Sequence, residues 1–237
     1  MQIGGLNIKS SIEAHSKEPV KLVLCLPGKT FSNHFIMSLI NTLNYLTKHN
    51  YIFVVSMYYS SVVYFARNGC LGCDTKRGRN QKPFDDKIDY THILWIDSDS
   101  VWNDTHIASL LEYAHKVDVI SGIYMTANRL NFATVLLKNW DMEYYREHGE
   151  FKFMTENDAK NKDLLEVAYT GFGFTLMTRR AIESLEYPWF RQTMLNVGDI
   201  QEITSEDVAC CTMLRENGFK IWVDPAIRIG HEKNIII

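Results

Sequence analysis

The first regular pattern in the chain is a short apolar run followed by a helical repeat. Residues 21–26 read Lys-Leu-Val-Leu-Cys-Leu and are stopped by Pro27-Gly28, which is typical of a strand buried on both faces. Ser32 can cap a following helix that ends near Asn50. The apolar residues at helical spacing in it are Ile36, Leu39, Ile40, Leu43 and Leu46. The pattern predicts a strand–loop–helix unit, for which a parallel sheet is the natural host.

The same alternation continues along the chain and becomes less regular in its second half. The further elements expected in the first half are strands at 51–57, 92–97 and 118–125, a weak helix at 58–70 and a helix at 104–116. Those expected later are strands at 131–137, 167–178 and 221–224, and a helix from Ser205 to Asn217-Gly218. An α/β domain with a mixed central sheet flanked by helices accounts for both halves.

Composition and charge narrow the class of protein. The 237 residues are 46% hydrophobic and 22% charged, values typical of a globular chain and not of a disordered one. We expect a flexible arm at 1–19 and one folded domain at 20–237, with halves at 20–125 and 126–237. The net charge of −3 excludes a globally basic nucleic-acid coat but allows a local basic patch.

Cellular location is predicted from segments that the sequence lacks. No stretch approaches the roughly 18 apolar residues of a spanning helix, and the first 19 residues contain no apolar signal-peptide core. Five cysteines, an odd number, give no sign of a disulfide framework. We therefore expect a protein without a membrane span that works in the cytoplasm, in the host cytoplasm if it is viral.

The strongest candidate for chemistry is Asp97-Ser98-Asp99, at the carboxyl end of the strand predicted at 92–97. Ligands bind at that end of the strands in open α/β sheets. Carboxylates at this spacing suit Mg²⁺ or Mn²⁺, and such a cation can bridge to the phosphates of a nucleotide. The alternative is a pair of acids that merely ends a strand in a turn. The position after a buried strand favours the metal site.

Two later segments are candidates to complete such a site. Glu206 and Asp207 open a helix, where acids either follow the helix dipole or place Asp207 to accept a proton from a hydroxyl. His231 follows the last predicted strand and is a candidate third ligand beside Asp99. A lone late histidine is more often a surface residue. Because an acidic strand end is also present, we favour the interpretation of His231 as a metal ligand.

Two glycine-containing motifs allow more than one interpretation. Gly171-Phe172-Gly173 interrupts an apolar strand, which indicates either a bulge or the close approach of a ligand to the backbone. Pro27-Gly28-Lys29-Thr30 resembles the end of a P-loop, but Val23 stands where that motif needs its first glycine. A P-loop-like NTPase or nucleotide-binding module therefore remains the alternative function.

One basic segment and one aromatic segment each allow two interpretations. Residues 67–82 carry five basic side chains against Asp74, which is a local charge of +4. Such a segment is either a lid over phosphates or a surface that attracts a polyanion. The aromatic residues of the charged segment 138–163 either stack on a sugar ring or a flipped base or pack that segment: Trp140, Tyr144 and Tyr145.

Taken together, the motifs resemble those of a GT-A-fold, nucleotide-sugar-dependent glycosyltransferase. The segments that carry the resemblance are 22–28, Ala66-Arg67-Asn68, 94–99, 170–178, 205–207 with 218–224, and Gly230-His231. It covers most of residues 20–233 and is nearest to the compact soluble enzymes of large DNA viruses and bacteriophages. The resemblance implies a single Rossmann-like GT-A domain.

The resemblance also implies roles for individual residues. Donor binding falls to Pro27, Gly28, Ser56, Arg67, Asp97 and Ser98. Binding of Mn²⁺ or Mg²⁺ falls to Asp97, Asp99 and His231. Acceptor binding falls to Gly171, Phe172, Gly173 and Trp140. In inverting members, the acid at the position of Asp207 is the general base, and Glu206 would orient the acceptor.

The function so implied is metal-dependent transfer of a sugar from a nucleotide-sugar, by analogy a UDP-sugar, to an acceptor hydroxyl. The expected partners are this donor and a glycan, a glycoprotein or a hydroxymethylated DNA base as acceptor. The resemblance favours inversion at the sugar, with Asp207 as the base. Retaining relatives also carry acids near this position, so the choice between inversion and retention stays open. The sequence leaves the donor sugar, the acceptor and the oligomeric state open.

Overall fold

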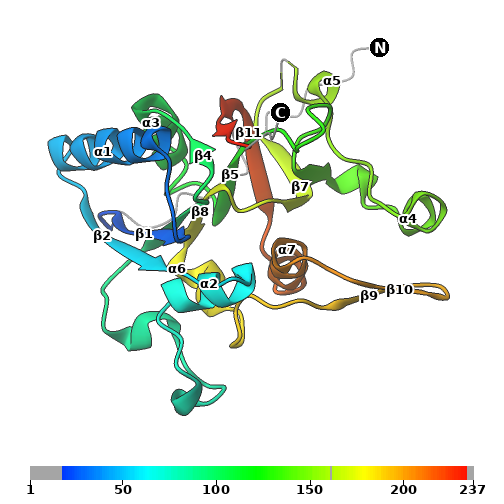
Figure 1. The fold of residues 1–237 in the computed structure, drawn as a ribbon, viewed down its shortest axis with the longest axis horizontal. Coiled ribbons are helices and arrows are strands. Elements are labelled where there is room, and N and C mark those ends of the chain that lie inside the picture. Colours follow the sequence, from blue (N-terminus) through cyan, green and yellow to red (C-terminus); the bar gives the residue numbers. More distant parts are fainter. Residues whose placement is uncertain (1–17, 161, 234–237) are drawn as a thin grey trace, which may run out of the picture.

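The computed structural model describes residues 18–160 and 162–233 (Figure 1). The predicted arm at 1–19 lies outside these residues except for its last two positions. No helix in the described ranges is both long enough and apolar enough to cross a bilayer.

An eight-stranded mixed sheet forms the centre of the molecule, in the order β2-β1-β3-β8-β5-β11-β7-β6. Its strands are β1 (Lys21–Pro27), β2 (Ile52–Tyr58), β3 (His92–Ile96), β5 (Val119–Ile123), β6 (Thr134–Leu136), β7 (Leu165–Thr170), β8 (Phe174–Thr178) and β11 (Ile221–Arg228). The pairs β1/β2, β1/β3 and β5/β11 are parallel, whereas β8 is antiparallel to β3 and β5, and β7 is antiparallel to β11 and β6. The predicted mixed sheet of an α/β domain is confirmed.

Helices cover both faces of this sheet (Figure 1). They are α1 (Asn33–Lys48), α2 (Val63–Cys70), α3 (Asp104–Leu111), α4 (Met142–His148), α5 (Glu156–Ala159), α6 (Arg179–Glu183) and α7 (Glu206–Glu216). Short 3₁₀ turns lie at η2 (Thr75–Arg77), η3 (Pro83–Asp86) and η4 (Leu137–Asn139). Two small antiparallel pairs are β4 (Ser100–Val101) with β12 (Gly230–His231), and β9 (Met194–Val197) with β10 (Ile200–Ile203).

The alternation of side chains along β1 separates two hydrophobic clusters. Leu22, Leu24 and Leu26 pack on the side of α1 and α3. Val23 and Cys25 belong to the cluster on the other face, which includes residues of α2, α6 and α7. Because successive side chains of a strand point to opposite faces, a strand covered on both faces is apolar throughout. This is why the continuous run at 21–26 correctly predicted a buried strand.

The buried face of α1 agrees with the predicted apolar repeat in part. Leu46 is buried, and Leu39 and Leu43 are partly buried against the cluster on this side. Ser32 caps the helix as expected, since its Oγ accepts a hydrogen bond from the Phe35 N–H at 3.0 Å. However, Ile36 and Ile40 are 41% and 44% exposed, and the helix buries Phe35, Ser38, Thr42 and Leu46. The hydroxyl of Ser38 donates to the carbonyl of Trp102 at 2.6 Å, and the Trp102 indole N–H donates to Thr42 at 2.7 Å. These partners make burial of the two hydroxyls favourable.

The segment 167–178, predicted as one interrupted strand, forms two separate strands. β7 and β8 are not neighbours, because β11 and β5 lie between them in the sheet. Gly171-Phe172-Gly173 is therefore a crossover between strands and not a bulge within one. A Cβ on Gly171 would lie 2.0 Å from the hydroxyl oxygen of Tyr124, and one on Gly173 would lie 2.7 Å from its ring. Both glycines are needed because Tyr124 packs against this backbone.

Candidate active site

The Asp97–Asp99 turn lies at the carboxyl end of β3, where three segments meet. The Asp97 N–H and the Ser100 hydroxyl both donate to the carbonyl of Gly173, at 3.2 and 2.9 Å. Gly28, after β1, packs so closely on the turn that a Cβ there would lie 2.6 Å from the Cβ of Ser98. The loop after β1, the acidic turn and the β7–β8 crossover thus form one edge of the sheet, as the strand-end argument predicts.

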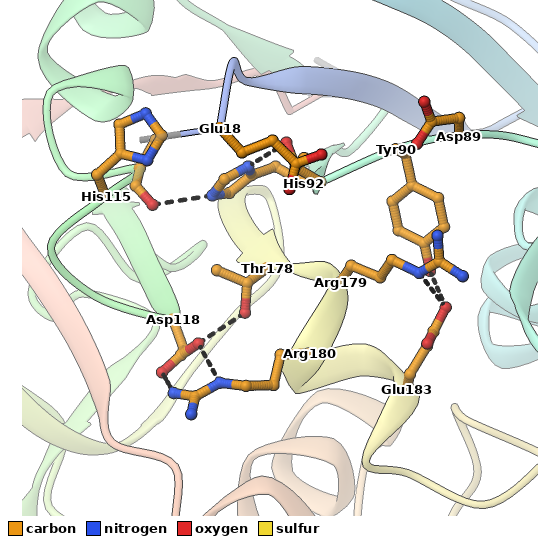
Figure 2. A pocket seen from close by; sticks show the side chains of 12 residues that line it. Glu18, Asp89, Tyr90, His92, His115, Asp118, Thr178, Arg179, Arg180 and Glu183 are labelled. Atoms are coloured by element: carbon orange, nitrogen blue, oxygen red, sulfur yellow. Dashed lines mark hydrogen bonds and ion pairs between the residues drawn. The ribbon is translucent and has the colours of Figure 1, made fainter. Parts of the chain in front are cut away.

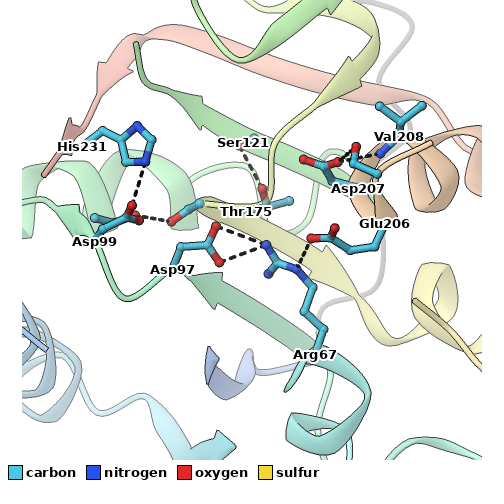
Figure 3. A network of polar contacts seen from close by, with 12 residues as sticks. Arg67, Asp97, Asp99, Ser121, Thr175, Glu206, Asp207, Val208 and His231 are labelled. Atoms are coloured by element: carbon cyan, nitrogen blue, oxygen red, sulfur yellow. Dashed lines mark hydrogen bonds and ion pairs between the residues drawn. The ribbon is translucent and has the colours of Figure 1, made fainter. Parts of the chain in front are cut away.

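Arg67 is the centre of a buried polar network (Figure 3). It comes from α2, its side chain is 2% exposed, and its Nη2 lies 2.9 Å from Asp97 Oδ1. Its Nε donates to Glu206 Oε1 at 3.2 Å. Three aromatic rings lie within 5.7 Å of the guanidinium carbon: Trp95, Phe172 and Phe190. Such rings stabilise a cation that has been removed from water.

The charges of this network are set by burial and by neighbouring groups. Burial opposes the charge of Arg67, but the carboxylates of Asp97 and Glu206 outweigh it and raise the pKa of Arg67 above its usual value. The pKa of Asp97 is also raised, chiefly by burial, although Arg67 acts in the opposite direction. The Nη1 atom of Arg67 is buried and has no hydrogen-bond partner among the described residues. Arg67 is therefore a permanent cation with one uncommitted donor.

Asp99, His231 and Lys233 form a second polar cluster in the site, separate from the Arg67 network. The Nε2 atom of His231 lies 2.9 Å from Asp99 Oδ2, and Lys233 Nζ donates to the same oxygen at 2.8 Å. Burial raises the pKa of Asp99, but the hydrogen bonds from His231 and Lys233 outweigh burial and lower it to about 2. The hydrogen bond with Asp99 raises the pKa of His231. The carboxylate is therefore charged at neutral pH.

The orientation of the His231 ring bears on metal binding. Its Nδ1 lies 3.0 Å from the carbonyl of Met125, so this nitrogen carries a proton and donates it. In a neutral ring Nε2 would then present a lone pair to the Asp99 carboxylate, and a cation belongs between two such acceptors. A histidine whose second nitrogen is held by a backbone carbonyl is typical of metal ligands. Asp99 and His231 thus fit a divalent cation.

The predicted three-residue ligand set is not assembled in the structure. Within 18–160 and 162–233, no group of three or more His, Cys, Asp or Glu side chains is placed to hold a metal. Asp97, the remaining predicted ligand, turns toward Arg67 (Figure 3). Asp99 and His231 are in contact and Asp97 pairs with Arg67, so the ligand roles of all three residues stay predictions.

Asp207 and Glu206 face different groups at the start of α7. Glu206 is buried and bonds to Arg67, whereas Asp207 is partly buried and accepts from the Tyr169 hydroxyl at 3.3 Å. Ser205 stands at the N-cap position of α7, but its hydroxyl donates to Asp207 and no backbone N–H of the helix donates to it. Burial and the adjacent charge of Glu206 raise the pKa of Asp207 to about 6. A carboxylate of this pKa is ionised at neutral pH and is a stronger base than an ordinary aspartate.

Other predicted site residues make contacts that the sequence did not indicate. The hydroxyl of Ser56 donates to the carbonyl of Cys70 at 2.6 Å and so joins β2 to α2. Phe172 is fully buried beside Arg67. Trp140 stacks on Phe151 with ring centroids 4.1 Å apart, and the guanidinium carbon of Arg215 lies 5.4 Å from the Trp140 ring centre. Direct substrate contacts by these three residues stay predictions.

Tyr124 is the site residue that sequence reasoning missed. Its ring packs on Gly171 and Gly173 and meets the His231 ring edge-on at 4.9 Å. Burial and the charges of Asp97 and Asp207 raise its pKa well above the usual value. The phenol therefore stays neutral and lies near the carboxylates on both sides of the site. The two closely spaced glycines were the available signal, since they indicate that something approaches the backbone.

The predicted basic segment is less basic on the surface than its composition suggests. Arg67 is buried in the site, and Arg77 and Lys82 pair with Asp85 and Asp86 at 2.8 and 3.3 Å. Acids just beyond the predicted boundary thus offset part of its charge. This weakens the interpretation as a polyanion-binding surface.

A cleft of about 490 Å³ lies at the other end of β3, away from Asp97 (Figure 2). Its charged side chains pair with one another: Arg180 with Asp118, and Arg179 with Glu183 at 2.6 Å. His92, the first residue of β3, bonds to the carbonyl of Ala114 at 2.9 Å. These contacts connect β3 and α6 with the segment between α3 and β5, and they hold this end of the sheet together.

Comparison with known families decides the class of enzyme. The profile of the family described as Glycosyltransferase like family 2 matches residues 57–234, which is most of the chain and includes both acidic segments of the site. The chain belongs to this glycosyltransferase family. No curated protein sequence matches it.

Solved structures share the fold of this glycosyltransferase at low sequence identity. A197 from STIV matches with a TM-score of 0.50 and 14% identity, over 92% of this chain and 97% of that one. GalNAc-T7 with UDP, GalNAc and Mn²⁺ matches with a TM-score of 0.55 and 11% identity, over 92% of this chain and 44% of that one. The catalytic domain of Drosophila β1,4-galactosyltransferase 7 in complex with xylobiose matches with a TM-score of 0.50 and 10% identity, over 91% of this chain and 71% of that one.

The family and the fold together confirm a GT-A, nucleotide-sugar-dependent glycosyltransferase. The alternative of a P-loop-like NTPase is set aside.

Proposed function

We propose that this glycosyltransferase transfers a sugar from a UDP-sugar to a glycan hydroxyl, with inversion at the sugar and with the help of a divalent cation. The observation that carries the proposal is the arrangement in Figure 3. Asp99 with His231, the proposed cation ligands, and Asp207, the proposed base, lie on two sides of the Arg67 network.

The cation would be held by Asp99 and His231, with Mn²⁺ favoured because imidazole and carboxylate are both good ligands for it. When bound, it would stabilise the negative charge that develops on the leaving diphosphate. Lys233 already lies 2.8 Å from Asp99 and adds positive charge to the same region. The solved structure of GalNAc-T7 with UDP and Mn²⁺ supports the choice of nucleotide and metal.

The donor would lie along the loop after β1 and over Asp97-Ser98. Gly28 leaves room there, because any larger residue would collide with Ser98. Arg67 would act chiefly by fixing the Asp97 carboxylate, and its uncommitted Nη1 is available to a polar group of the donor. Since Arg67 keeps its charge at every physiological pH, this part of the site is ordered before the donor binds.

Asp207 would remove the proton of the acceptor hydroxyl as its oxygen attacks the anomeric carbon. Its pKa of about 6 keeps it ionised at neutral pH yet basic enough to accept the proton. The Tyr169 hydroxyl orients the carboxylate through one oxygen. A single displacement with such a base inverts the configuration of the sugar. A glycan hydroxyl is favoured over a hydroxymethylated DNA base, because the basic segment is partly neutralised by its own acids.

Donor hydrolysis tests the proposal without knowledge of the acceptor. We expect slow, Mn²⁺-stimulated hydrolysis of one UDP-sugar in a panel of UDP-, GDP- and CDP-sugars. Asp207→Asn should keep nucleotide binding and lose transfer to an added glycan. Hydrolysis of nucleoside triphosphates in place of nucleotide-sugars would contradict the proposed donor class.

A further inference from the structure

β2 is an edge strand with an apolar outer side. It ends the sheet order, and β1 is its neighbour in the described sheet (Figure 1). Four of its side chains are between 41% and 58% exposed: Ile52, Val54, Val55 and Met57. The backbone N–H and C=O groups on the outer side of an edge strand are free to pair with another strand. β2 therefore offers both hydrogen-bonding groups and apolar side chains.

In the part of the chain that the structure describes, β2 lacks the usual protection of an edge strand. Residues 51–66 contain no charged side chain and no proline. Pairing with β1 is continuous over seven residues, from Lys21 opposite Ile52 to Pro27 opposite Tyr58, without a bulge. Natural proteins prevent edge-to-edge association with lysine, proline, bulges or short strands. A long, regular and uncharged edge strand therefore indicates that β2 pairs with a strand of another chain.

The helices beside β2 enlarge the apolar surface. Both α1 and α2 contact β2. Further exposed apolar side chains, on α1 and from the end of β2 into α2, are Ile36, Met37, Ile40, Tyr58, Tyr59, Val62, Val63 and Phe65, at 37% to 57% exposure. With about half of each large side chain exposed, the apolar area is on the order of 1,000 Å². A monomer rarely exposes that much, and a standard interface buries about 800 Å² on each partner.

We propose that β2 pairs antiparallel with β2 of a second copy of this chain, so that two sheets join across a two-fold axis into a homodimer. A two-fold interface uses the same patch on both subunits, and an uncharged strand opposite itself brings no like charges together. The apolar area is sufficient for one such interface. A membrane surface fits less well, because residues 51–66 lack the lysines and arginines that anionic lipids attract.

The oligomeric state of the full chain tests this proposal. Light scattering after size exclusion should give twice the chain mass of 27.5 kDa at micromolar concentration. Ile52→Lys and Val55→Lys, one change on each face of β2, should each give the monomer mass while circular dichroism stays native. Leu130→Lys is the matched control, since Leu130 is 72% exposed and lies outside this surface.

The opposite outcomes are equally clear. A monomeric wild-type chain, or a dimer that persists in both lysine variants, overturns the proposal. A monomeric chain that sediments with lipid vesicles and loses this binding in Val55→Lys would assign the patch to a membrane instead. If the lysine variants misfold, hydrogen exchange of the wild-type chain decides. Protection of β2 amides must fall on dilution, and protection that is independent of concentration overturns the proposal.

Discussion

Arg67 shows how one buried residue organises the site. It bonds to Asp97 after β3 and to Glu206 on α7, residues 30 and 139 positions away in the sequence. The sequence predicted a donor-binding role for it but not this partnership. The contact with Glu206 depends on α2 and α7 packing on the same face of the sheet, which no local pattern reveals. The acids at 97, 99 and 207 were predictable, because strand ends and helix starts can be located from sequence.

Removing the charge of Arg67 should destabilise the fold. Arg67→Met would leave two acids without their cation, at a cost of about 3–5 kcal/mol for breaking a buried ion pair. We expect a large fall in Tm by calorimetry. Adding Glu206→Gln should restore part of the loss, because one of the unpaired charges is then removed. An unchanged Tm in the single variant would show that the network contributes little to stability.

The pH dependence of transfer should report Asp207. With a pKa of about 6, the carboxylate becomes an active base as the pH rises through 6, so kcat/KM should rise over this range. Asp207→Asn should lower kcat by about 10²-fold and abolish this rise. A variant with the wild-type rate and profile would exclude Asp207 as the base.

The raised pKa of Asp207 also makes the stability of the fold depend on pH. Because the pKa is raised in the folded state, ionised Asp207 costs stability, and this cost develops as the pH rises from about 4, its unfolded value, to above 6. Asp207→Asn should therefore have a higher Tm than the wild type at pH 8 and nearly the same Tm at pH 4. A lower Tm at pH 8 would show that the charge is well accommodated.

At the scale of elements, the continuous apolar strands were predicted well and the contacts between elements were not. β1, β3 and β5 are buried on both faces, and each gives a run that stands out in the sequence. β7 and β8 were predicted as one strand because a local sequence pattern does not show which strands become neighbours in the sheet. The buried face of α1 was predicted only in part, because Ser38 and Thr42 are polar in sequence but paired with Trp102 in the fold.

The crossover between β7 and β8 should not tolerate a side chain at Gly173. In Gly173→Ala the new Cβ would lie 2.7 Å from the Tyr124 ring, so the ring or the backbone beneath Asp97 must move. We expect lower stability and loss of donor hydrolysis. In a Tyr124→Ala background, Gly173→Ala should lower stability much less, because the collision is already removed. A stable and active Gly173→Ala would show that Tyr124 moves freely.

At the scale of the molecule, the candidate site and the exposed apolar surface lie in different places. The candidate site is at the carboxyl ends of the strands, and the apolar surface surrounds the edge strand β2. The net charge of −3 includes the acids of the site, whose charges are partly offset there by Arg67 and Lys233. Fold and enzyme class could be inferred from the order of the motifs. The edge strand could not be recognised from sequence, because an apolar run at 51–57 is equally typical of a central strand.

Metal-dependent binding of UDP tests the central claim most directly. Titration calorimetry should show at least tenfold tighter UDP binding with Mn²⁺ than without it for the wild-type chain. Asp99→Ala should lose this difference, whereas Asp207→Asn should keep it. Equal affinity with and without Mn²⁺ in the wild type, or an undiminished Mn²⁺ effect in Asp99→Ala, would contradict the account.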